Sequence, residues 1–349
     1  MRIVHIIWGL GIGGAETMLV DIVNEQVKSE SVAIAIVNDT INESLLHKLD
    51  KRCKVWQFNR KIGSKNLLPW IKLNIRLFRY KPDIIHFHLE GMRKMVVHPA
   101  PKVFTIHNTH TSVREYPRYQ ALFAISDGVK AYTQKQGFES TTIWNGIKPE
   151  QIKEKARGEY LVGGVCKIVC IGRLFTPHKG QDILVEALGK LKKQGNSDFH
   201  LDIIGEGESR VYLENLIHQR GLDGCVSLLG QRSRDYIYEH LCDYDLFVLP
   251  SRSEGFGLSV AEAMCAKIPV LVSNLEGVLD VIDGGRLGIT FESGNADSLS
   301  ERLLGFLTKG KNESQIEEAF RFAREEFDIC RTAKGYIIEY GEVIESYKA

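Results

Sequence analysis

Residues 3–28 read IVHIIWGLGIGGAETMLVDIVNEQVK, and this stretch shows the pattern that the rest of the chain repeats. Ile3–Trp8 is an apolar run of the length of a strand. Glycines follow at once, and Ala15–Lys28 then repeats apolar side chains at the i, i+3, i+4 spacing of an amphipathic helix. The order strand, glycine turn, helix predicts the repeating unit of a parallel α/β sheet.

The same order recurs along the remaining sequence. Short runs rich in Val and Ile predict strands at 32–37, 54–58, 83–88, 103–107, 121–126, 142–144, 167–171, 200–204, 226–229, 245–249 and 270–272. Amphipathic segments predict helices at 66–80, 181–194, 210–220, 235–242 and 258–266, and a nearly all-helical chain after residue 295. Residues 148–165 are polar, lack periodicity and end in Gly163-Gly164, so we predict an interdomain linker there. The fold class expected is α/β, with two doubly wound domains.

Composition excludes several classes of protein. With 349 residues, 44% hydrophobic and 26% charged, the chain is too long for one small core and too apolar for a disordered protein. Its apolar runs are too short to cross a bilayer, and Met1-Arg2 leads into a strand rather than a signal peptide. Seven scattered cysteines without a Cys-x-x-Cys pair indicate neither a disulfide framework nor a zinc site. We therefore expect a protein of the reducing cytoplasm.

The net charge of +1 conceals an asymmetry between the two halves. Residues 1–155 hold 23 Lys and Arg against 14 Asp and Glu, so this part carries +9 and the remainder −8. Ten of the basic residues, and no acidic one, lie within 51–81, interleaved with aromatic residues. One interpretation is a helix at 66–80 with a solvated basic face, whose Leu67, Ile71, Leu73 and Phe78 face the domain core. The other is contact with an anionic membrane leaflet or a lipid-diphosphate acceptor.

The glycines after the first strand form the first candidate site. Gly9, Gly11 and Gly14 satisfy G-x-G-x-x-G, the dinucleotide fingerprint, and Asp39 loosely meets the acidic residue expected further on. Glycines at a helix start let the backbone approach an anion. Binding of a nicotinamide dinucleotide, contact with another phosphate or substrate, and a purely structural turn all remain open.

A second glycine loop joins a strand to a helix at Gly172–Gly180. Arg173 and Lys179 project from this loop, at the carboxyl edge of the second sheet, where α/β proteins bind ligands. A guanidinium and an ammonium suit a diphosphate. A solvated turn would look the same.

The sharpest constellation is Pro250–Met264, in which two carboxylates flank a glycine turn that opens a helix. Glu254 lies in the loop and Glu262 within the helix, and the backbone N–H groups of 257–259 face whatever binds there. Because the helix is otherwise small and apolar, the Glu262 carboxylate needs a polar partner, for which a sugar hydroxyl is suitable.

Glu254-x7-Glu262, together with Gly172-Arg173-Leu and His178-Lys179-Gly180, resembles the retaining glycosyltransferases of the GT-B fold, in particular their large fourth family. Further likenesses follow in the same order along nearly the whole chain: Gly13-Gly14-Ala-Glu16, Asp83-Ile-Ile-His-Phe-His88, Thr105-Ile-His107-Asn, Trp144-Asn145-Gly146-Ile, Ile204-Gly205-Glu-Gly207 and Leu229-Gly230-Gln231. The sequence departs from the family pattern at Glu276–Asp280 and Ala266–Pro269, which bears on donor selectivity more than on the reaction.

The resemblance implies two Rossmann-like domains that face a cleft. Residues 1–150 would form the acceptor-binding domain, with a C-terminal helix at about 331–349 packed back on it, and 160–330 the domain that binds a nucleotide sugar. The catalytic residues implied are Arg173, Lys179, Glu254 and His107. The donor-binding residues implied are Glu262 at the ribose, Gly205, Glu206 and Gln231 at the base, and Phe256, Gly257, Leu258 and Ser259 at the sugar and diphosphate. Gly13 and Gly14 would contact phosphate or acceptor.

The implied reaction is retaining transfer of a hexose or N-acetylhexosamine from a nucleotide diphosphate sugar, by default a UDP-sugar, to a glycan or lipid-linked acceptor. It would serve surface polysaccharide or glycolipid biosynthesis in the cytoplasm or on the inner face of the membrane, with no cofactor, no metal and no nucleic acid. Asp243-Tyr-Asp245 resembles a metal–nucleotide motif of another glycosyltransferase fold but merely leads into a strand here. Alternatives are a nucleotide-sugar epimerase, an NAD-dependent oxidoreductase and a non-catalytic binding protein.

Overall fold

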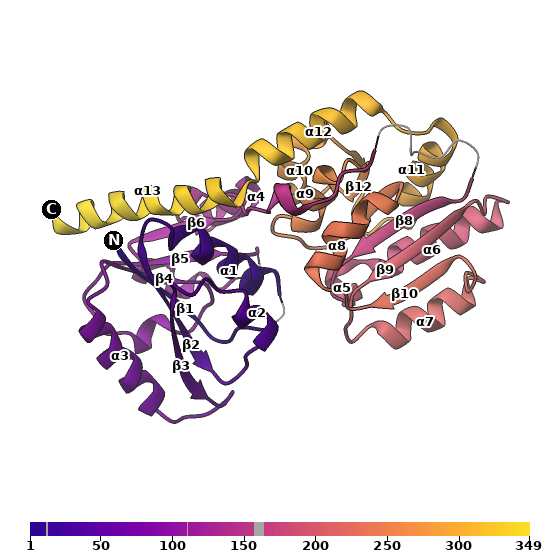
Figure 1. Ribbon diagram of the computed structural model, residues 1–349. Helices are drawn as coiled ribbons and strands as arrows, with labels where there is room; N and C mark the ends of the chain where they lie inside the picture. The colour runs from indigo at the N-terminus through magenta and orange to yellow at the C-terminus, as the bar shows by residue number, and fades with distance from the viewer. Residues whose placement is uncertain (12, 110, 157–163) are drawn as a thin grey trace. The chain divides into compact units, whose positions relative to one another are not determined.

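The computed structural model describes residues 1–11, 13–109, 111–156 and 164–349 (Figure 1). The chain forms two compact units: unit 1 comprises Met1–Gly146 and Ile329–Ala349, and unit 2 comprises Ile147–Asp328. The part 157–163 of the expected linker, with Gly163, lies outside the described residues.

Unit 1 is a parallel sheet covered by helices. Its strands are β1 (Arg2–Ile7), β2 (Ser31–Asn38), β3 (Lys54–Arg60), β4 (Ile84–Phe87), β5 (Lys102–Ile106), β6 (Ala121–Ala124) and β7 (Thr141–Thr142). Its helices are α1 (Gly14–Gln26), α2 (Glu43–His47), α3 (Leu68–Tyr80), α4 (Asp127–Lys135) and α13 (Ile329–Lys348). α13, yellow in Figure 1, comes from the end of the chain and packs on α1.

The strands of unit 1 lie in the order β3-β2-β1-β4-β5-β6-β7. Ile3 of β1 pairs with Val32 of β2 on one side and with Ile84 of β4 on the other. The sheet therefore extends in one direction from β1 through β2 and β3, and in the opposite direction from β4 onward. Ile3, Val4 and Ile6 are wholly buried although their side chains alternate in direction, because helices cover both faces of the sheet. The carboxyl ends of β1 and β4 therefore flank a topological switch point.

Unit 2 repeats this plan. Its strands are β8 (Cys166–Ile171), β9 (Phe199–Ile204), β10 (Val226–Gly230), β11 (Leu246–Leu249), β12 (Val270–Ser273) and β13 (Ile289–Phe291). Its helices are α5 (Thr176–Lys179), α6 (Gln181–Lys193), α7 (Arg210–Gln219), α8 (Arg234–His240), α9 (Leu258–Cys265), α10 (Glu276–Val281), α11 (Ala296–Lys309) and α12 (Glu313–Glu326). The parallel strand order β10-β9-β8-β11-β12-β13 places a second switch point between β8 and β11.

The predicted fold class, two doubly wound α/β domains, is confirmed, with differences at some elements. The strand predicted at 121–126 ends at Ala124, because the Ser126 hydroxyl accepts a hydrogen bond from the Val129 amide (3.1 Å) and caps α4. No prediction covered α2, α4, α5, α10 or β13. β13 has only three residues, too few for a recognisable alternation.

Two expectations from composition can be compared directly with the structure. The seven cysteines, all among the described residues, form no disulfide, and five of them are buried. In the described parts of the chain, every helix is too short or too polar to cross a lipid bilayer.

Candidate active site

The loops that follow β8, β9 and β11 touch one another at the switch point of unit 2. Gly180 adopts φ +63°, and a Cβ atom there would overlap the carbonyl oxygen of Pro250. Gly205 adopts φ +150°, and its Cβ would overlap the carbonyl oxygen of Gly172. Both contacts require glycine, because any side chain would force the loops apart. The glycines noted in the sequence thus bring three loops into backbone contact.

Lys179 and Glu254 meet across this switch point. The Nζ of Lys179 lies 2.6 Å from Oε2 of Glu254, and the two side chains are 30% and 16% exposed. The Ser251 hydroxyl donates to the same carboxylate oxygen at 3.5 Å. The amides of Arg252 and Ser253 donate to the carbonyl of His178, at 2.8 and 3.1 Å, and hold the two loops together. A charged pair therefore lies at the sheet edge where ligands bind in α/β proteins.

Arg173 comes from the same loop as Lys179 but has a different partner. Its Nη2 lies 2.7 Å from Oε1 of Glu208, and its side chain is 65% exposed. Phe175 lies below the guanidinium, 5.6 Å from ring centre to Cζ. The structure therefore brings Lys179 and Glu254 together and directs Arg173 to the rim beside them.

Glu262, expected to hold ribose, is buried on α9 with a protein partner. Its Oε1 lies 3.5 Å from Nε of Arg234 at the start of α8, and its residue is 8% exposed. The sequence analysis missed Arg234, because no local spacing connects it with α9. The predicted need of this carboxylate for a polar partner is met in part by the guanidinium.

The turn before α9 presents backbone rather than side chains. Gly257 is the N-cap of α9 with φ +97°, and Leu258 and Ser259 begin the helix. The Phe256 ring is 1% exposed and packs edge-on against Phe327 at 5.2 Å. Because its ring is buried, Phe256 can contribute only its main chain to a ligand.

The residues assigned to the base lie on two adjacent loops, after β9 and β10. Glu206 accepts a hydrogen bond from Nη1 of Arg210 at 2.6 Å. A Cβ atom at Gly230 would lie 3.1 Å from Oε1 of Glu206, so the two loops are neighbours. Gln231 follows Gly230 and is exposed.

The remaining predicted residues belong to unit 1. Gly13 is the N-cap of α1 and Gly14 is its first residue, and the neighbouring residue 12 lies outside the described chain. His107 follows β5, and its Nε2 is buried without a hydrogen-bond partner among the described residues. Burial lowers the pKa of His107 to about 4, so the imidazole is neutral at pH 7.

Three more histidines, which the sequence analysis did not single out as site residues, are buried behind His107. The Nε2 of His5 donates to Oε1 of Gln26 (2.8 Å), because that amide oxygen can only accept. The Nδ1 of His5 then accepts from Nε2 of His88 (2.9 Å). Burial lowers the pKa of His5 to about 4 and holds those of His86 and His88 well below their ordinary range. The rings of His88 and His107 are 6.0 Å apart.

Two family models together match most of the chain. "Glycosyltransferase Family 4" matches residues 12–151, and "Glycosyl transferases group 1" matches residues 152–321. The chain belongs to the group 1 glycosyltransferases.

Relatives of this glycosyltransferase are similar over part of their length. The amylovoran biosynthesis glycosyltransferase AmsK of Erwinia amylovora is 30% identical over 269 residues, 69% of this chain and 65% of that protein. A GDP-mannose-dependent phosphatidylinositol monomannoside mannosyltransferase of Mycobacterium tuberculosis is 28% identical over 162 residues, 44% and 42% of the two chains. The chain spans about half the length of the curated relatives it matches.

Solved structures show the same fold. The crystal structure of Anabaena HepE in complex with UDP and glucose superposes with a TM-score of 0.79 over 98% of this chain and 99% of that one, at 21% identity. Its likeness confirms the GT-B architecture of this glycosyltransferase.

Two sets of residues bear on metal binding in this glycosyltransferase. Among the described residues, His5, His86 and His88 lie close enough for a metal ion, with ligand atoms within 4.8 Å of one another. Both nitrogens of His86 already contact hydroxyls, Tyr340 at 2.6 Å and Thr105 at 2.7 Å. The set is therefore a hydrogen-bonded network in the core of unit 1.

The acidic motif Asp243-Tyr-Asp245 and the switch-point loops of unit 2 lie at opposite edges of the sheet. Asp245 pairs with Nζ of Lys155 at 2.9 Å and accepts the Lys167 amide at 2.9 Å. Because Asp245 precedes β11, it stands at the amino edge, opposite the switch-point loops. The expectation that Asp243-Tyr-Asp245 merely leads into a strand agrees with this placement.

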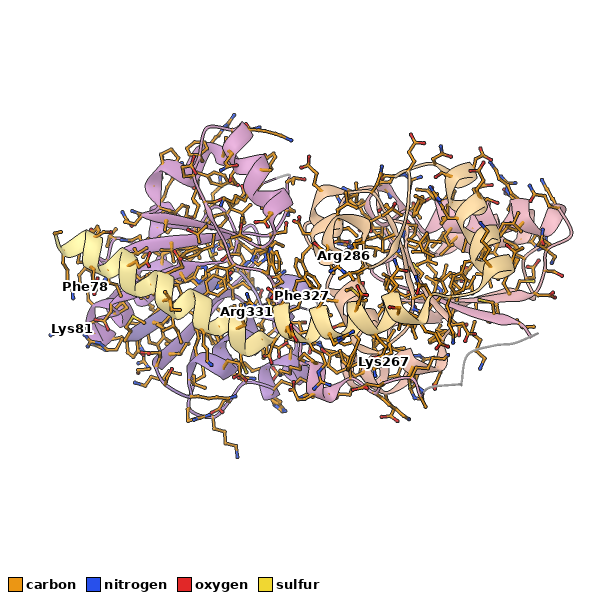
Figure 2. The ribbon with its side chains drawn as sticks, turned by 90° about the horizontal axis from the view of Figure 1, so that it is seen from above. Phe78, Lys81, Lys267, Arg286, Phe327 and Arg331 are labelled. Carbon is orange, nitrogen blue, oxygen red and sulfur yellow. The ribbon has the colours of Figure 1, made fainter. Side chains whose placement is uncertain are left out.

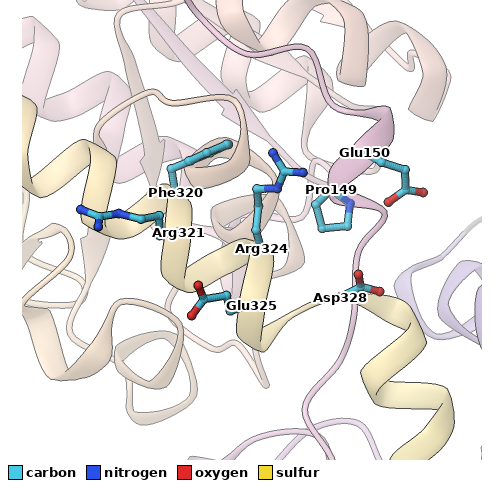
Figure 3. Close-up of a pocket in the computed structure, with 7 residues that line it drawn as sticks. All are labelled: Pro149, Glu150, Phe320, Arg321, Arg324, Glu325 and Asp328. Carbon is cyan, nitrogen blue, oxygen red and sulfur yellow. The ribbon is translucent and has the colours of Figure 1, made fainter.

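A surface pocket of about 410 Å³ lies elsewhere in unit 2 (Figure 3). Its lining residues are Pro149, Glu150, Phe320, Arg321, Arg324, Glu325 and Asp328. Arg324 stacks on Phe320, 5.2 Å from the ring centre, and lies 3.3 Å from Glu154. None of the lining residues belongs to the predicted donor site.

Proposed function

We propose that this glycosyltransferase moves a hexose or an N-acetylhexosamine from a nucleotide diphosphate sugar to a glycan or lipid-linked acceptor, with retention of the anomeric configuration. The observation that carries the proposal is the contact of Lys179 with Glu254 at the switch point of unit 2. A biosynthetic role in surface polysaccharide or glycolipid assembly draws support from the name of the Erwinia relative.

In this reaction the bond between the anomeric carbon and the diphosphate oxygen breaks, and its electron pair leaves with the diphosphate. The acceptor hydroxyl oxygen bonds to the same carbon, and its proton passes to the oxygen of the departing diphosphate. We assign Lys179, Arg173 and the N–H groups of Leu258 and Ser259 to the departing negative charge. Fixed donors of this kind stabilise an oxocarbenium-like transition state because they need no reorganisation as charge develops.

The other residues take the roles that the resemblance implies. Glu254 and the backbone at Phe256 and Gly257 orient the sugar. Glu262 binds the ribose, with Arg234 fixing its carboxylate. The loops of Gly205, Glu206 and Gln231 form the base subsite. For unit 1 we propose that His107, neutral at pH 7, approaches the sugar from the acceptor-binding domain, and that Gly13 and Gly14 contact phosphate or acceptor. The proposal includes no metal and no cofactor.

The identity of the donor can be measured directly. HepE was crystallised with UDP and glucose, whereas the mycobacterial relative is named for GDP-mannose. A thermal-shift series of the full chain with UDP-, GDP- and ADP-sugars should show one specific rise in melting temperature, because a ligand bound only by the folded state stabilises it. We expect UDP-sugars to give it. Stabilisation by NAD(P) alone would point instead to an oxidoreductase.

Turnover separates the remaining alternatives. With the donor identified, release of nucleoside diphosphate should require an acceptor and persist in EDTA, and the product should keep the anomeric configuration of the donor. Conversion of the donor without acceptor would indicate an epimerase. Activity abolished by EDTA and restored by manganese would overturn the metal-free proposal.

A further inference from the structure

Helix α3 of unit 1 is apolar on two opposite sides. Trp70, Leu73 and Leu77 face the core and are at most 5% exposed. A second stripe, spaced by three, four and three residues, runs along the outside: Leu68, Ile71, Ile75 and Phe78, exposed to 50%, 53%, 47% and 49%. The interpretation in which Leu67, Ile71, Leu73 and Phe78 face the core is therefore right for Leu73 and wrong for the other three. This spacing places the second stripe on one helical face.

The outer stripe belongs to a larger patch. Six of the fourteen exposed large hydrophobic side chains in the described residues fall within 62–78. Val97, 69% exposed, extends the patch from a neighbouring segment, because its amide donates to Oδ1 of Asn74 on α3 at 2.9 Å. Single exposed apolar side chains are normal, but a contiguous group marks an interaction surface. We name Leu67, Leu68, Ile71, Ile75, Phe78 and Val97 the α3 patch. Figure 2 shows Phe78 and Lys81 at the periphery of unit 1.

Cations border the α3 patch. Lys72 and Arg79 lie one helical turn or less from the stripe, and Lys65 and Lys81 stand at its two ends, all exposed. None of these four has an acidic partner among the described residues. Within 51–81 there is no acidic residue at all, so the local field is positive throughout.

We infer that the α3 patch docks this protein onto an anionic lipid surface. An apolar stripe flanked by Lys and Arg matches the boundary between phosphate headgroups and acyl chains. There the apolar side chains contact the acyl chains, and the Lys and Arg side chains contact the phosphates. Two copies of the chain pairing through this face would bring the same cations together, which disfavours a dimer. The inference goes beyond the proposed function, since it holds whatever the acceptor is.

Sedimentation with lipid vesicles tests the inference on the full chain. Binding should be strong to phosphatidylcholine vesicles that contain phosphatidylglycerol, weak to phosphatidylcholine alone, and should fall as salt is raised. The double variant Lys72→Gln/Arg79→Gln should weaken binding about 25-fold, at about five-fold for each cation. The double variant Ile71→Ser/Phe78→Ser should weaken it about ten-fold or more.

Matched variants on α13, in the same unit, serve as controls. Ile338 is 63% exposed and Lys334 is exposed, so Lys334→Gln/Ile338→Ser removes similar groups away from the patch and should bind vesicles like the unmodified chain. Melting temperatures verify that each variant folds. If Ile71→Ser/Phe78→Ser does not fold, Lys72→Gln/Arg79→Gln, which leaves the apolar packing intact, decides whether the patch binds lipid. Equal binding to both vesicle types, or normal binding of the α3 variants, would overturn the inference. So would self-association without lipid that Phe78→Ser abolishes.

Discussion

The two switch points of this glycosyltransferase are built from the same strand order but filled with different chemistry. In unit 2, the loops after β8 and β11 carry the ion pair of Lys179 and Glu254. In unit 1, β1 carries His5, β4 carries His86, and His88 follows β4; all three are buried and neutral at pH 7. One edge carries formal charges, and the other holds buried neutral imidazoles.

The difference teaches that the scaffold sets where a ligand binds, while the side chains set which kind. Cations suit a diphosphate, and the loops of unit 2 carry Lys179 and Arg173, to which the proposed function assigns the leaving group. In unit 1, His107 follows β5 and is neutral at pH 7, so under the proposed function it offers an uncharged hydrogen-bonding group. The predictions that follow change one side of this comparison at a time.

Acidification should give the largest effect, and it should act on unit 1. His5 and His107 have a folded pKa of about 4 against an ordinary 6.5, so the unfolded chain binds more protons between these values. Stability is therefore complete above pH 6.5 and is lost as pH falls toward 4. At pH 5 each of these two histidines should lower the free energy of unfolding by about 2 kcal/mol relative to neutral pH. His86 and His88 should add to the loss.

The measurement can be confined to unit 1, because all four tryptophans, Trp8, Trp56, Trp70 and Trp144, belong to it. We expect the midpoint of urea unfolding, monitored by tryptophan fluorescence, to fall to a much lower urea concentration when the pH is lowered from 7 to 5. His47→Gln, at an exposed site on α2, should leave that shift unchanged. A fluorescence transition that stays at the same urea concentration over this range would contradict buried, neutral histidines.

The charged side of the comparison is tested by Lys179→Ala. Loss of a preorganised donor for the leaving diphosphate should lower turnover by about 10²–10³-fold with little change in melting temperature. Arg173→Ala should also cripple turnover, although its contact with Glu208 is at the rim. Lys153→Ala is the control, since this lysine forms an exposed ion pair with Glu239 at 2.7 Å in the same unit. Normal rates in either of the first two variants would reject that residue's assignment.

Local patterns in the sequence predicted most strands and helices, but not which strands are neighbours or which distant side chains meet. The alternation of apolar runs and amphipathic segments is a local signal, so most strands and helices were found. Strand order is not local: Lys179 and Glu254 are separated by 75 positions and meet only because β8 and β11 are neighbours. The sequence predicted Lys179 at a sheet edge and Glu254 in a loop before a helix, and only the resemblance assigned them to one site.

The contacts between buried side chains could not be predicted from the sequence either, because their partners lie far apart along the chain. Arg234 and Glu262 pair across two helices. The core network of unit 1 joins His86 to Thr105 and to Tyr340, 254 positions away. Only the family resemblance assigned the C-terminal helix to the first domain, and no sequence pattern indicates that a tyrosine of that helix reaches a histidine of β4.

Backbone contact between loops of unit 2 is tested by Gly205→Ala. Its φ of +150° is unfavourable for alanine, and the new Cβ would overlap the Gly172 carbonyl oxygen. We expect a loss of about 3 kcal/mol in unfolding free energy, combining backbone strain with the displaced loop. Gly195→Ala, at φ +88° with open space around it, should cost about 1 kcal/mol. Equal losses in thermal or urea unfolding would mean that the loops do not meet as described.

The smallest effect expected comes from Tyr340→Phe on α13. The Tyr340 hydroxyl contacts Nδ1 of His86 at 2.6 Å in a fully buried site, so its removal leaves a ring nitrogen that water cannot reach. An unsatisfied buried group costs about 1–2 kcal/mol. Tyr347→Phe removes a hydroxyl that donates to Pro99 at 2.9 Å from a half-exposed ring, and water can replace that bond, so its cost should stay below about 0.5 kcal/mol.

Tryptophan-monitored urea unfolding distinguishes these two tyrosines, since both lie on the same helix of unit 1. A larger loss for Tyr340→Phe would show that α13 is held by the neutral histidine network, and that the end of the chain contributes to the interior of unit 1. Equal losses for the two variants would mean that α13 is held by apolar packing alone. In that case the histidine-rich core of unit 1 would owe nothing to the C-terminal helix, and the contrast with the charged edge of unit 2 would rest on β1, β4 and β5.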